Sequence, residues 1–208
     1  KRRALSKRDP RVVILVPTRE LAKQVYSQLR LLLAGTRLNS TLIQGGENFN
    51  DQLKQLQKDP HFIVATPGRL VDHLKQRNVF LEGLELLILD EADRMLDLGF
   101  APAMRAINQA ANHRLRQTLF FSATLDNTEV NEIADELLKE PSRVAVGQGF
   151  DEHQDIEQHV YLCDHLDHKE ALLKHFLAAE SIKQAIVFTA TKLDTVRLAE
   201  SIQEWGLT

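Results

Sequence analysis

The chain has 208 residues, of which 43% are hydrophobic and 26% charged, a balance that excludes a disordered chain and a collagen-like or coiled-coil rod. Its 26 basic and 29 acidic residues give a net charge of −3, which excludes a large basic field for nucleic acid but not local phosphate contacts. No apolar run approaches the ~20 residues that span a bilayer, and no signal peptide opens the chain, so no membrane role is expected.

Short apolar runs of strand length alternate with longer amphipathic runs along the chain. The predicted strands are residues 12–16, 41–44, 62–65, 86–89, 118–121, 143–146, 159–163 and 185–188. The predicted helices between them are residues 20–33, 49–58, 69–76, 101–111, 127–139, 169–178 and 192–205. Continuously apolar strands that alternate with helices predict an α/β fold with a mainly parallel sheet covered on both faces.

Domain organisation follows from length and from one polar segment. At roughly 150 residues per domain, the length predicts one domain and a fraction of a second. Residues 147–157 are polar, contain two glycines and have no periodicity, which predicts a linker between a first domain at 1–146 and the start of a second at 158–208. Because the chain opens at Lys1 without a methionine, we expect it to be a piece of a longer protein. The basic stretch at 1–10 is interpreted as a solvated loop rather than a nucleic-acid arm.

Cysteine and histidine usage argues against disulfide or zinc chemistry. Cys163 is the single cysteine, so an internal disulfide is impossible and a reducing, cytoplasmic location is expected. His165, Asp167 and His168 do not have the spacing of a standard zinc site. Asp167 is instead expected to cap the helix that begins near Lys169.

The sharpest chemical signal is an acidic cluster directly after the predicted strand 86–89. Asp90, Glu91 and Asp93 place three carboxylates within four residues. Their mutual repulsion can be offset by a hard cation, and Mg²⁺ with a nucleotide would do so. The alternative is that these residues simply open the next helix, where the macrodipole favours acidic side chains. Spacing alone leaves both interpretations open.

Turns suited to phosphate binding follow the first three predicted strands. Their residues are Pro17, Thr18 and Arg19, then Gly45 and Gly46, then Thr66, Pro67, Gly68 and Arg69. Free backbone N–H groups, a hydroxyl and a guanidinium at a helix N-terminus bind phosphate, and paired glycines permit close backbone approach. Ordinary capping and turn chemistry explains each turn singly. Because ligands collect at the carboxyl ends of parallel strands, three such turns at one edge favour the phosphate interpretation.

Together these segments resemble the motifs of DEAD-box RNA helicases. The matching runs, in the family's order and spacing, are Pro-Thr-Arg-Glu-Leu-Ala-Lys-Gln at 17–24, Gly-Gly at 45–46, Thr-Pro-Gly-Arg at 66–69, Asp-Glu-Ala-Asp at 90–93 and Ser-Ala-Thr at 122–124. The resemblance covers nearly the whole chain. It implies a RecA-like parallel sheet flanked by helices in a truncated first domain, then the linker and the start of a second RecA-like domain, where residues 186–188 resemble its first strand motif.

The resemblance also implies a role for each motif. Asp90 would hold Mg²⁺ largely through water, and Glu91 would activate the water that attacks the γ-phosphate of ATP. Asp93 would couple to Ser122 and Thr124 and so link the nucleotide state to the grip on RNA. The implied RNA-binding residues are Pro17, Thr18, Arg19, Gly45, Gly46, Thr66, Pro67, Gly68 and Arg69. RNA would be held through phosphates and 2′-hydroxyls with little base specificity, and ribosomal or ribonucleoprotein proteins are further expected partners, whereas DNA is not.

One element that phosphoryl transfer needs has no counterpart in these 208 residues. No glycine is followed by lysine, so the chain has no Gly-Lys-Ser/Thr loop to cradle phosphates. We therefore predict an ATP-dependent RNA helicase that unwinds RNA or remodels ribonucleoproteins as the parent protein, and no ATP turnover by this chain alone. The alternative is a non-catalytic RNA- or protein-binding module, which a Gly-Lys-Thr loop in the upstream flank would exclude. Because the family's first strand lies inside the sheet, we also expect open apolar strand edges that promote self-association.

Overall fold

The structure, a computed structural model, describes residues 9–124, 127–146 and 156–207. The chain divides into two compact units, Lys1–Phe150 and Asp151–Thr208. This division falls within the predicted linker, residues 147–157, most of which lies outside the described residues. The same holds for residues 1–8 of the basic N-terminal stretch.

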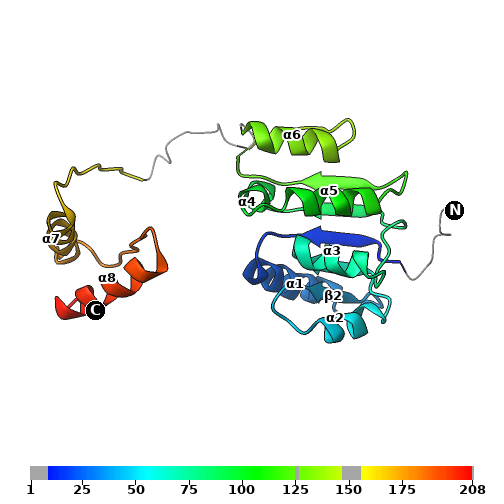
Figure 1. The fold of residues 1–208 in the computed structure, drawn as a ribbon, viewed down its shortest axis with the longest axis horizontal. Helices are drawn as coiled ribbons and strands as arrows, with labels where there is room; N and C mark the ends of the chain where they lie inside the picture. Colours follow the sequence, from blue (N-terminus) through cyan, green and yellow to red (C-terminus); the bar gives the residue numbers. More distant parts are fainter. Residues whose placement is uncertain (1–8, 125–126, 147–155, 208) are drawn as a thin grey trace. The chain divides into compact units, whose positions relative to one another are not determined.

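The first unit is built on a five-stranded parallel sheet (Figure 1). Its strands are β1 (Val12–Leu15), β2 (Ser40–Ile43), β3 (Phe62–Ala65), β4 (Leu86–Leu89) and β5 (Gln117–Phe120). They lie in the order β2-β3-β1-β4-β5, and every neighbouring pair is parallel. The α/β prediction is thus confirmed, and each of these strands starts and ends within one residue of its predicted bounds.

Six helices of the first unit lie in the described residues. They are α1 (Arg19–Leu33), α2 (Phe49–Leu56), α3 (Pro67–Lys75), α4 (Ala92–Asp97), α5 (Ala101–Ala110) and α6 (Thr128–Leu137). The short helix α4 was not among the predicted elements. Thr66 is the N-cap of α3 and Pro67 its first residue, although the Thr66 hydroxyl makes no capping hydrogen bond. The rigid φ of proline favours a helix start here without that bond.

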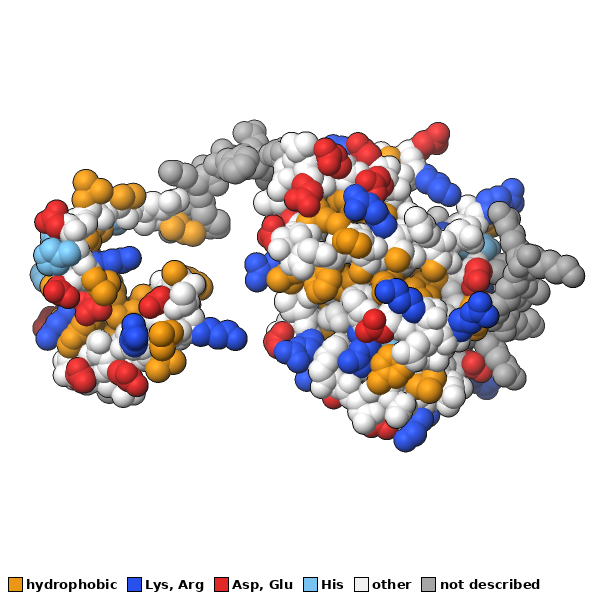
Figure 2. All heavy atoms as spheres, viewed as in Figure 1, with side chains coloured by type: hydrophobic (Ala, Val, Ile, Leu, Met, Phe, Trp, Pro, Cys, Tyr) orange, Lys and Arg blue, Asp and Glu red, His pale blue; other side chains and the backbone are white. Residues whose placement is uncertain are grey.

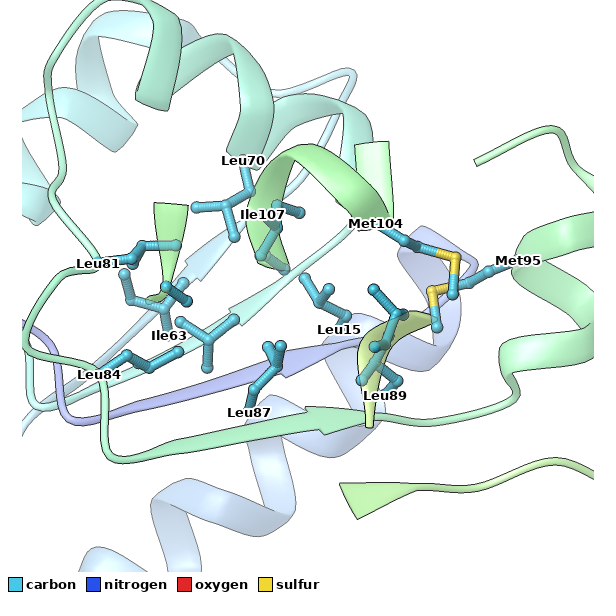
Figure 3. Packing of buried hydrophobic residues seen from close by; sticks show 14 of the residues in the cluster. Leu15, Ile63, Leu70, Leu81, Leu84, Leu87, Leu89, Met95, Met104 and Ile107 are labelled. Atoms are coloured by element: carbon cyan, nitrogen blue, oxygen red, sulfur yellow. The ribbon is translucent and has the colours of Figure 1, made fainter. Parts of the chain in front are cut away.

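The sheet buries an apolar layer on each face. The larger layer, drawn in Figure 3, includes Leu15, Ile63, Leu70, Leu87, Leu89, Met95, Met104 and Ile107. These side chains come from β1, β3 and β4 and from helices α3, α4 and α5. On the opposite face, Ala22 of α1 packs against Val16 and Val64. A connection from β1 through α1 to β2 therefore runs on one face, and the later connections run on the other.

Side chains on the α1 face of β1 and β4 are less covered than those on the other face. Val12 and Ile14 of β1 and Leu86 and Ile88 of β4 are half-buried, whereas their alternating neighbours are fully buried. Strand β5 pairs only with β4 among the described strands, and its last three residues are half-buried. Within the described part of the chain, β5 thus leaves one edge of the sheet unpaired, as expected from the sequence, while self-association stays a prediction.

The second unit contributes helices α7 (Leu166–Leu177) and α8 (Lys192–Glu204), neither of which has a buried residue. Apolar side chains consequently lie open on this unit (Figure 2); Val160, Leu162 and Phe188 are 91%, 92% and 90% exposed. The prediction of three further strands was wrong: these described segments form no strand, at 143–146, 159–163 and 185–188. A strand needs a neighbour for its backbone hydrogen bonds, and no described segment pairs with any of the three.

The start of α7 also differs from the prediction. His165 is the N-cap, and its Nδ1 accepts from the His168 N–H at 3.2 Å. Asp167 therefore does not cap the helix but lies in its first turn. Within the described residues, no group of three His, Cys, Asp or Glu side chains is placed to hold a metal ion. None of the described helices combines the length and apolar character needed to cross a bilayer.

Arg116 is expected to be a main polar contributor to the stability of the first unit. Its guanidinium donates to the Asn108 carbonyl at 3.2 Å and to the Ala111 carbonyl at the end of α5, and to Thr118 Oγ1 of β5 at 3.2 Å. Arg116→Met should lower the free energy of unfolding by about 1–3 kcal/mol, because part-buried carbonyls lose their donor. Urea denaturation measures this, and Arg114→Met, two residues away and exposed, is the matched control. Equal effects of the two substitutions would contradict the expectation.

Candidate functional site

All five strands end in one row, which defines the candidate site. The last strand residues are paired neighbours across the sheet: Ile43, Ala65, Leu15, Leu89 and Phe120. Because the strands are parallel and in register, the turns that follow them lie along the same edge. We call this edge, formed by residues 17–19, 45–46, 66–69, 90–93 and 122–124, the carboxyl edge. Every residue singled out from the sequence as a candidate site residue lies on it.

The strand order places the acidic cluster next to the phosphate-suited turns. From β2 to β5, the turns are 45–46, 66–69, 17–19, 90–93 and 122–124. The connection after β1 runs towards β2, and the connection after β4 runs towards β5. Adjacent strands whose connections diverge mark the crevice in which open α/β sheets bind ligands. Residues 17–19 and 90–91 flank that crevice.

Arg19 is a free cation placed over the Gly45–Gly46 turn. Thr18 caps α1 by accepting from the Leu21 N–H at 3.2 Å, which leaves Arg19 exposed at the first helical position. No described residue accepts a hydrogen bond from the Arg19 guanidinium. A Cβ on Gly46 would collide with Arg19 Nη1, and Gly46 also has a φ of +80°. The positive φ favours glycine at this position, and a side chain there would also force the Arg19 guanidinium to move.

Arg69 is held differently from Arg19. Its side chain is 16% exposed, and its Nη1 donates to the Glu47 carbonyl at 3.0 Å and to Gln52 Oε1 at 3.4 Å. Its Cζ lies 5.5 Å from the centroid of the Phe49 ring. Among the described residues, no acceptor faces its Nη2. The side chain thus braces the loop after Gly46, and Nη2 remains open to a ligand.

The acidic cluster begins where β4 ends. The Asp90 N–H donates to the Leu15 carbonyl at 2.9 Å, and Asp90 Oδ1 accepts from the Glu91 N–H at 3.0 Å. Glu91 is exposed and is the N-cap of α4, with a φ of 51°, a left-handed conformation that costs a non-glycine residue free energy and is common at functional sites. The acidic residues do open a helix, as the alternative interpretation held. That helix has six residues, and its position still leaves Asp90 and Glu91 open to a ligand.

Asp93 connects the acidic cluster to the end of β5. Its Oδ2 accepts from the Thr124 hydroxyl at 2.9 Å and from the Thr124 N–H at 3.2 Å, and its Oδ1 accepts from the Arg94 N–H at 3.0 Å. Partial burial raises the pKa of Asp93, but hydrogen bonds from Thr124, Arg94 and Ser122 outweigh it, and the pKa lies below its ordinary 3.8. The charged form of Asp93 therefore holds Thr124 in place.

Removing the Thr124 hydroxyl is expected to raise the pKa of Asp93. With a lowered pKa, the contribution of Asp93 to stability is present above pH 3.8, the ordinary value, and is lost as the pH falls through the lower folded-state pKa. In Thr124→Val the pKa of Asp93 should rise, and its contribution to stability should therefore begin to be lost at a higher pH. Carboxyl ¹³C chemical shifts titrated against pH measure the change. Thr128→Val, at the exposed first residue of α6, is the control, and an unchanged Asp93 pKa in Thr124→Val would contradict the assignment.

Asp90 and Glu91 are suited to a magnesium nucleotide. Mg²⁺ usually takes one or two carboxylates, several waters and phosphate oxygens, and the two adjacent carboxyl groups satisfy the protein's share. Backbone N–H groups of the neighbouring turns and Arg19 lie along the same edge.

Two buried polar residues beside the carboxyl edge were not among the residues predicted from the sequence. Gln52 of α2 and His73 of α3 are 5% and 0% exposed and contact Arg69 or its partners. A signal was present: Gln52 lies three residues after Phe49 and four before Leu56, a position on the apolar face of the helix. A polar residue at such a position needs a hydrogen-bonding partner.

Comparison with known proteins identifies the family. A family profile described as DEAD/DEAH box helicase matches residues 2–133. The chain belongs to the DEAD/DEAH box helicase family. Within that family, the chain is 39% identical over 198 residues to the ATP-dependent RNA helicase SrmB of Escherichia coli K12, covering 95% of this chain and 44% of SrmB.

Other members of the DEAD/DEAH box helicase family give the same picture. The chain is 37% identical to the ATP-dependent RNA helicase RhlB of Pseudomonas aeruginosa, with coverage of 96% and 50%, and 37% identical to the ATP-dependent rRNA helicase RRP3 of Yarrowia lipolytica, with coverage of 93% and 40%. The chain thus spans about half the length of these relatives.

A solved structure of the family supports the fold. The crystal structure of a hypothetical ATP-dependent RNA helicase from Sulfolobus tokodaii superposes with a TM-score of 0.59 at 28% identity, over 64% of this chain and 39% of that one. The predicted RecA-like α/β fold class is therefore confirmed.

Proposed function

We propose that this chain is part of an ATP-dependent RNA helicase, and that its carboxyl edge holds the RNA backbone next to carboxylates that serve the nucleotide. The carrying observation is the single row of strand ends, in which the turns 45–46, 66–69 and 17–19 follow one another and residues 90–93 come next, directly beside 17–19. Relatives named ATP-dependent RNA helicases support the proposal. Residues 1–146 and 158–208 would belong to two RecA-like domains joined by a linker.

RNA would be held by its phosphates and 2′-hydroxyls. Arg19 and Arg69 Nη2 supply charged donors. The backbone of Thr18, Gly46 and Gly68 can approach the RNA closely. Such contacts do not read base edges, so little sequence preference is expected. A local row of donors also explains how a chain with a net charge of −3 can bind RNA. Cytoplasmic ribosome or ribonucleoprotein assembly is the setting we propose.

On the nucleotide side, Asp90 would hold Mg²⁺ through water and Glu91 would orient and deprotonate the attacking water. Bound Mg²⁺ would neutralise charge on the phosphates of ATP. Asp93, Ser122 and Thr124 would transmit the occupancy of this site to the RNA-binding turns, because Thr124 is hydrogen-bonded to Asp93.

This chain alone should not turn over ATP. No Gly-Lys-Ser/Thr sequence occurs in its 208 residues, and phosphoryl transfer on this fold requires that loop. Phosphate release with MgATP and RNA should remain at background. Turnover that Glu91→Gln abolishes would contradict this. The missing loop also favours a second candidate function, that of a non-catalytic RNA-binding module. A Gly-Lys-Thr loop encoded upstream would support the helicase and exclude the module.

Fluorescence anisotropy with the purified 208-residue chain tests the RNA-binding part. A labelled oligouridylate and a mixed-sequence RNA of equal length should bind with the same affinity within about threefold, since backbone contacts carry no sequence information. DNA of the same mixed sequence should bind more weakly, because it lacks 2′-hydroxyls. Absent RNA binding, or strong preference for one sequence, would overturn the proposal.

A further inference from the structure

A buried chain of hydrogen bonds lies beneath the Gly45–Gly46 turn. Asn78 Nδ2 donates to His73 Nδ1 at 3.2 Å, His73 Nε2 donates to Gln52 Oε1 at 3.3 Å, and Gln52 Nε2 donates to the Gln44 carbonyl at 2.7 Å. The Asn78 amide nitrogen can only donate, so these partners assign the His73 proton to Nε2. Each group in this chain has a partner of the right type, and the last acceptor directly precedes Gly45.

A second path reaches the other end of the same turn. Arg69 Nη1 donates both to the Glu47 carbonyl at 3.0 Å and to Gln52 Oε1 at 3.4 Å. Gln52 is therefore the branch point, since its oxygen accepts from both His73 and Arg69 while its nitrogen donates to Gln44. The carbonyl before Gly45 and the carbonyl after Gly46 are both held by side chains of α2 and α3.

Phe49 closes the assembly on the side of α2. Its ring stacks on His73 with a centroid distance of 4.0 Å and an interplanar angle of 11°, and Arg69 Cζ lies 5.5 Å from its centroid. A stacked imidazole and a cation share this ring, which limits the rotamers of both side chains.

The charge state of His73 suits this arrangement. Burial lowers the pKa of His73 below its ordinary 6.5, nearby Arg69 lowers it further, and Asp72 opposes them. The imidazole is thus neutral near pH 7, as its acceptor role towards Asn78 requires.

We propose that Gln52 and His73 are positioning residues for RNA binding. His73 orients Gln52, which holds the carbonyl before Gly45 directly and contacts Arg69, the residue that holds the carbonyl after Gly46. Together these contacts fix the turn against which the Arg19 guanidinium lies. Gly46 lies so close to Arg19 that a side chain there would collide with Nη1. The position of the turn therefore limits where the guanidinium can lie. This inference rests on the proposed RNA-binding function of the carboxyl edge.

The test compares Gln52→Leu with Gln55→Leu in the full 208-residue chain. Both residues lie on α2, but Gln52 is buried and Gln55 exposed. Affinity for a labelled oligouridylate is measured by anisotropy at a temperature where circular dichroism shows each variant to be folded. Gln52→Leu should weaken binding about threefold to tenfold, the effect of losing one or two neutral hydrogen bonds, and Gln55→Leu less than about twofold. His73→Phe, which keeps the stacked ring but not the N–H, should also weaken binding of the oligouridylate.

A double-mutant cycle separates positioning from general stability. If Gln52 acts through the place of Arg19, Gln52→Leu should cost less than about twofold when added to Arg19→Ala. Equal affinities of the Gln52→Leu and Gln55→Leu chains, or a full additional loss in the Arg19→Ala background, would overturn the positioning role. Failure of the wild-type chain to bind the oligouridylate, or no effect of Arg19→Ala itself, would instead reject the proposed function.

Discussion

Arg19→Ala is expected to weaken binding of single-stranded RNA about ten- to hundredfold, because a hydrogen bond to a charged group contributes about 1.5–3 kcal/mol. Arg19 is exposed, has no acceptor among the described residues and lies over the glycine turn. Loss of one phosphate contact should also reduce the slope of log affinity against log salt by about 0.7. Anisotropy titrations of an oligouridylate at several salt concentrations measure both quantities.

Arg30→Ala provides the matched control for this prediction. Arg30 lies in the last turn of the same helix and is exposed, and eleven residues of helix place it about 16 Å from Arg19. Removing either arginine changes the net charge equally. If affinity fell by the same factor in both variants, general electrostatics and not a local contact would explain binding.

Leu87→Ala is expected to lower the free energy of unfolding of the first unit by about 2–5 kcal/mol. Leu87 is 1% exposed in β4 and belongs to the larger apolar layer with Leu15, Ile63 and Ile107 (Figure 3). Truncation would remove apolar contacts and leave a cavity in the apolar layer between the sheet and its helices. For a domain whose total stability is typically 5–15 kcal/mol, such a loss is large. Chemical denaturation followed by circular dichroism measures it.

Leu86→Ala is the control for the core substitution. Leu86 is the neighbouring residue of β4, but it is half-buried on the less covered face. Its loss should cost less than about 2 kcal/mol. A Leu86→Ala cost equal to that of Leu87→Ala would show that the two faces of β4 are equally covered, contrary to the structure.

The parallel sheet and its carboxyl edge could be predicted because each step depends on local patterns. Residues 62–65 and 86–89 are apolar runs of strand length followed by turn or acidic residues, and parallel strands bring such turns to one edge. Neighbouring strands within the chain supply the hydrogen bonds these runs need, so the local signal and the fold agree.

The structure of the second unit and the partners of the site side chains depend on long-range contacts, which a sequence pattern does not show. Residues 159–163 and 185–188 have the composition of strands, yet no described partner strand is present for them, and Phe188 remains 90% exposed. The motif residue Arg69 was expected to face RNA. One of the Arg69 nitrogens instead donates to Gln52, which lies on a different helix. A side-chain pair so far apart in the sequence produces no periodic pattern from which it could be predicted.

The most direct test of the carboxyl edge as one RNA-binding surface is an NMR titration. Backbone amide signals of the ¹⁵N-labelled chain would be followed while an oligouridylate is added. We predict that the amides of Thr18, Gly46 and Gly68 shift together with a single affinity, while those of Gln55 and Arg30 stay in place. Shifts confined to other surfaces, or different affinities for the three turns, would contradict the account.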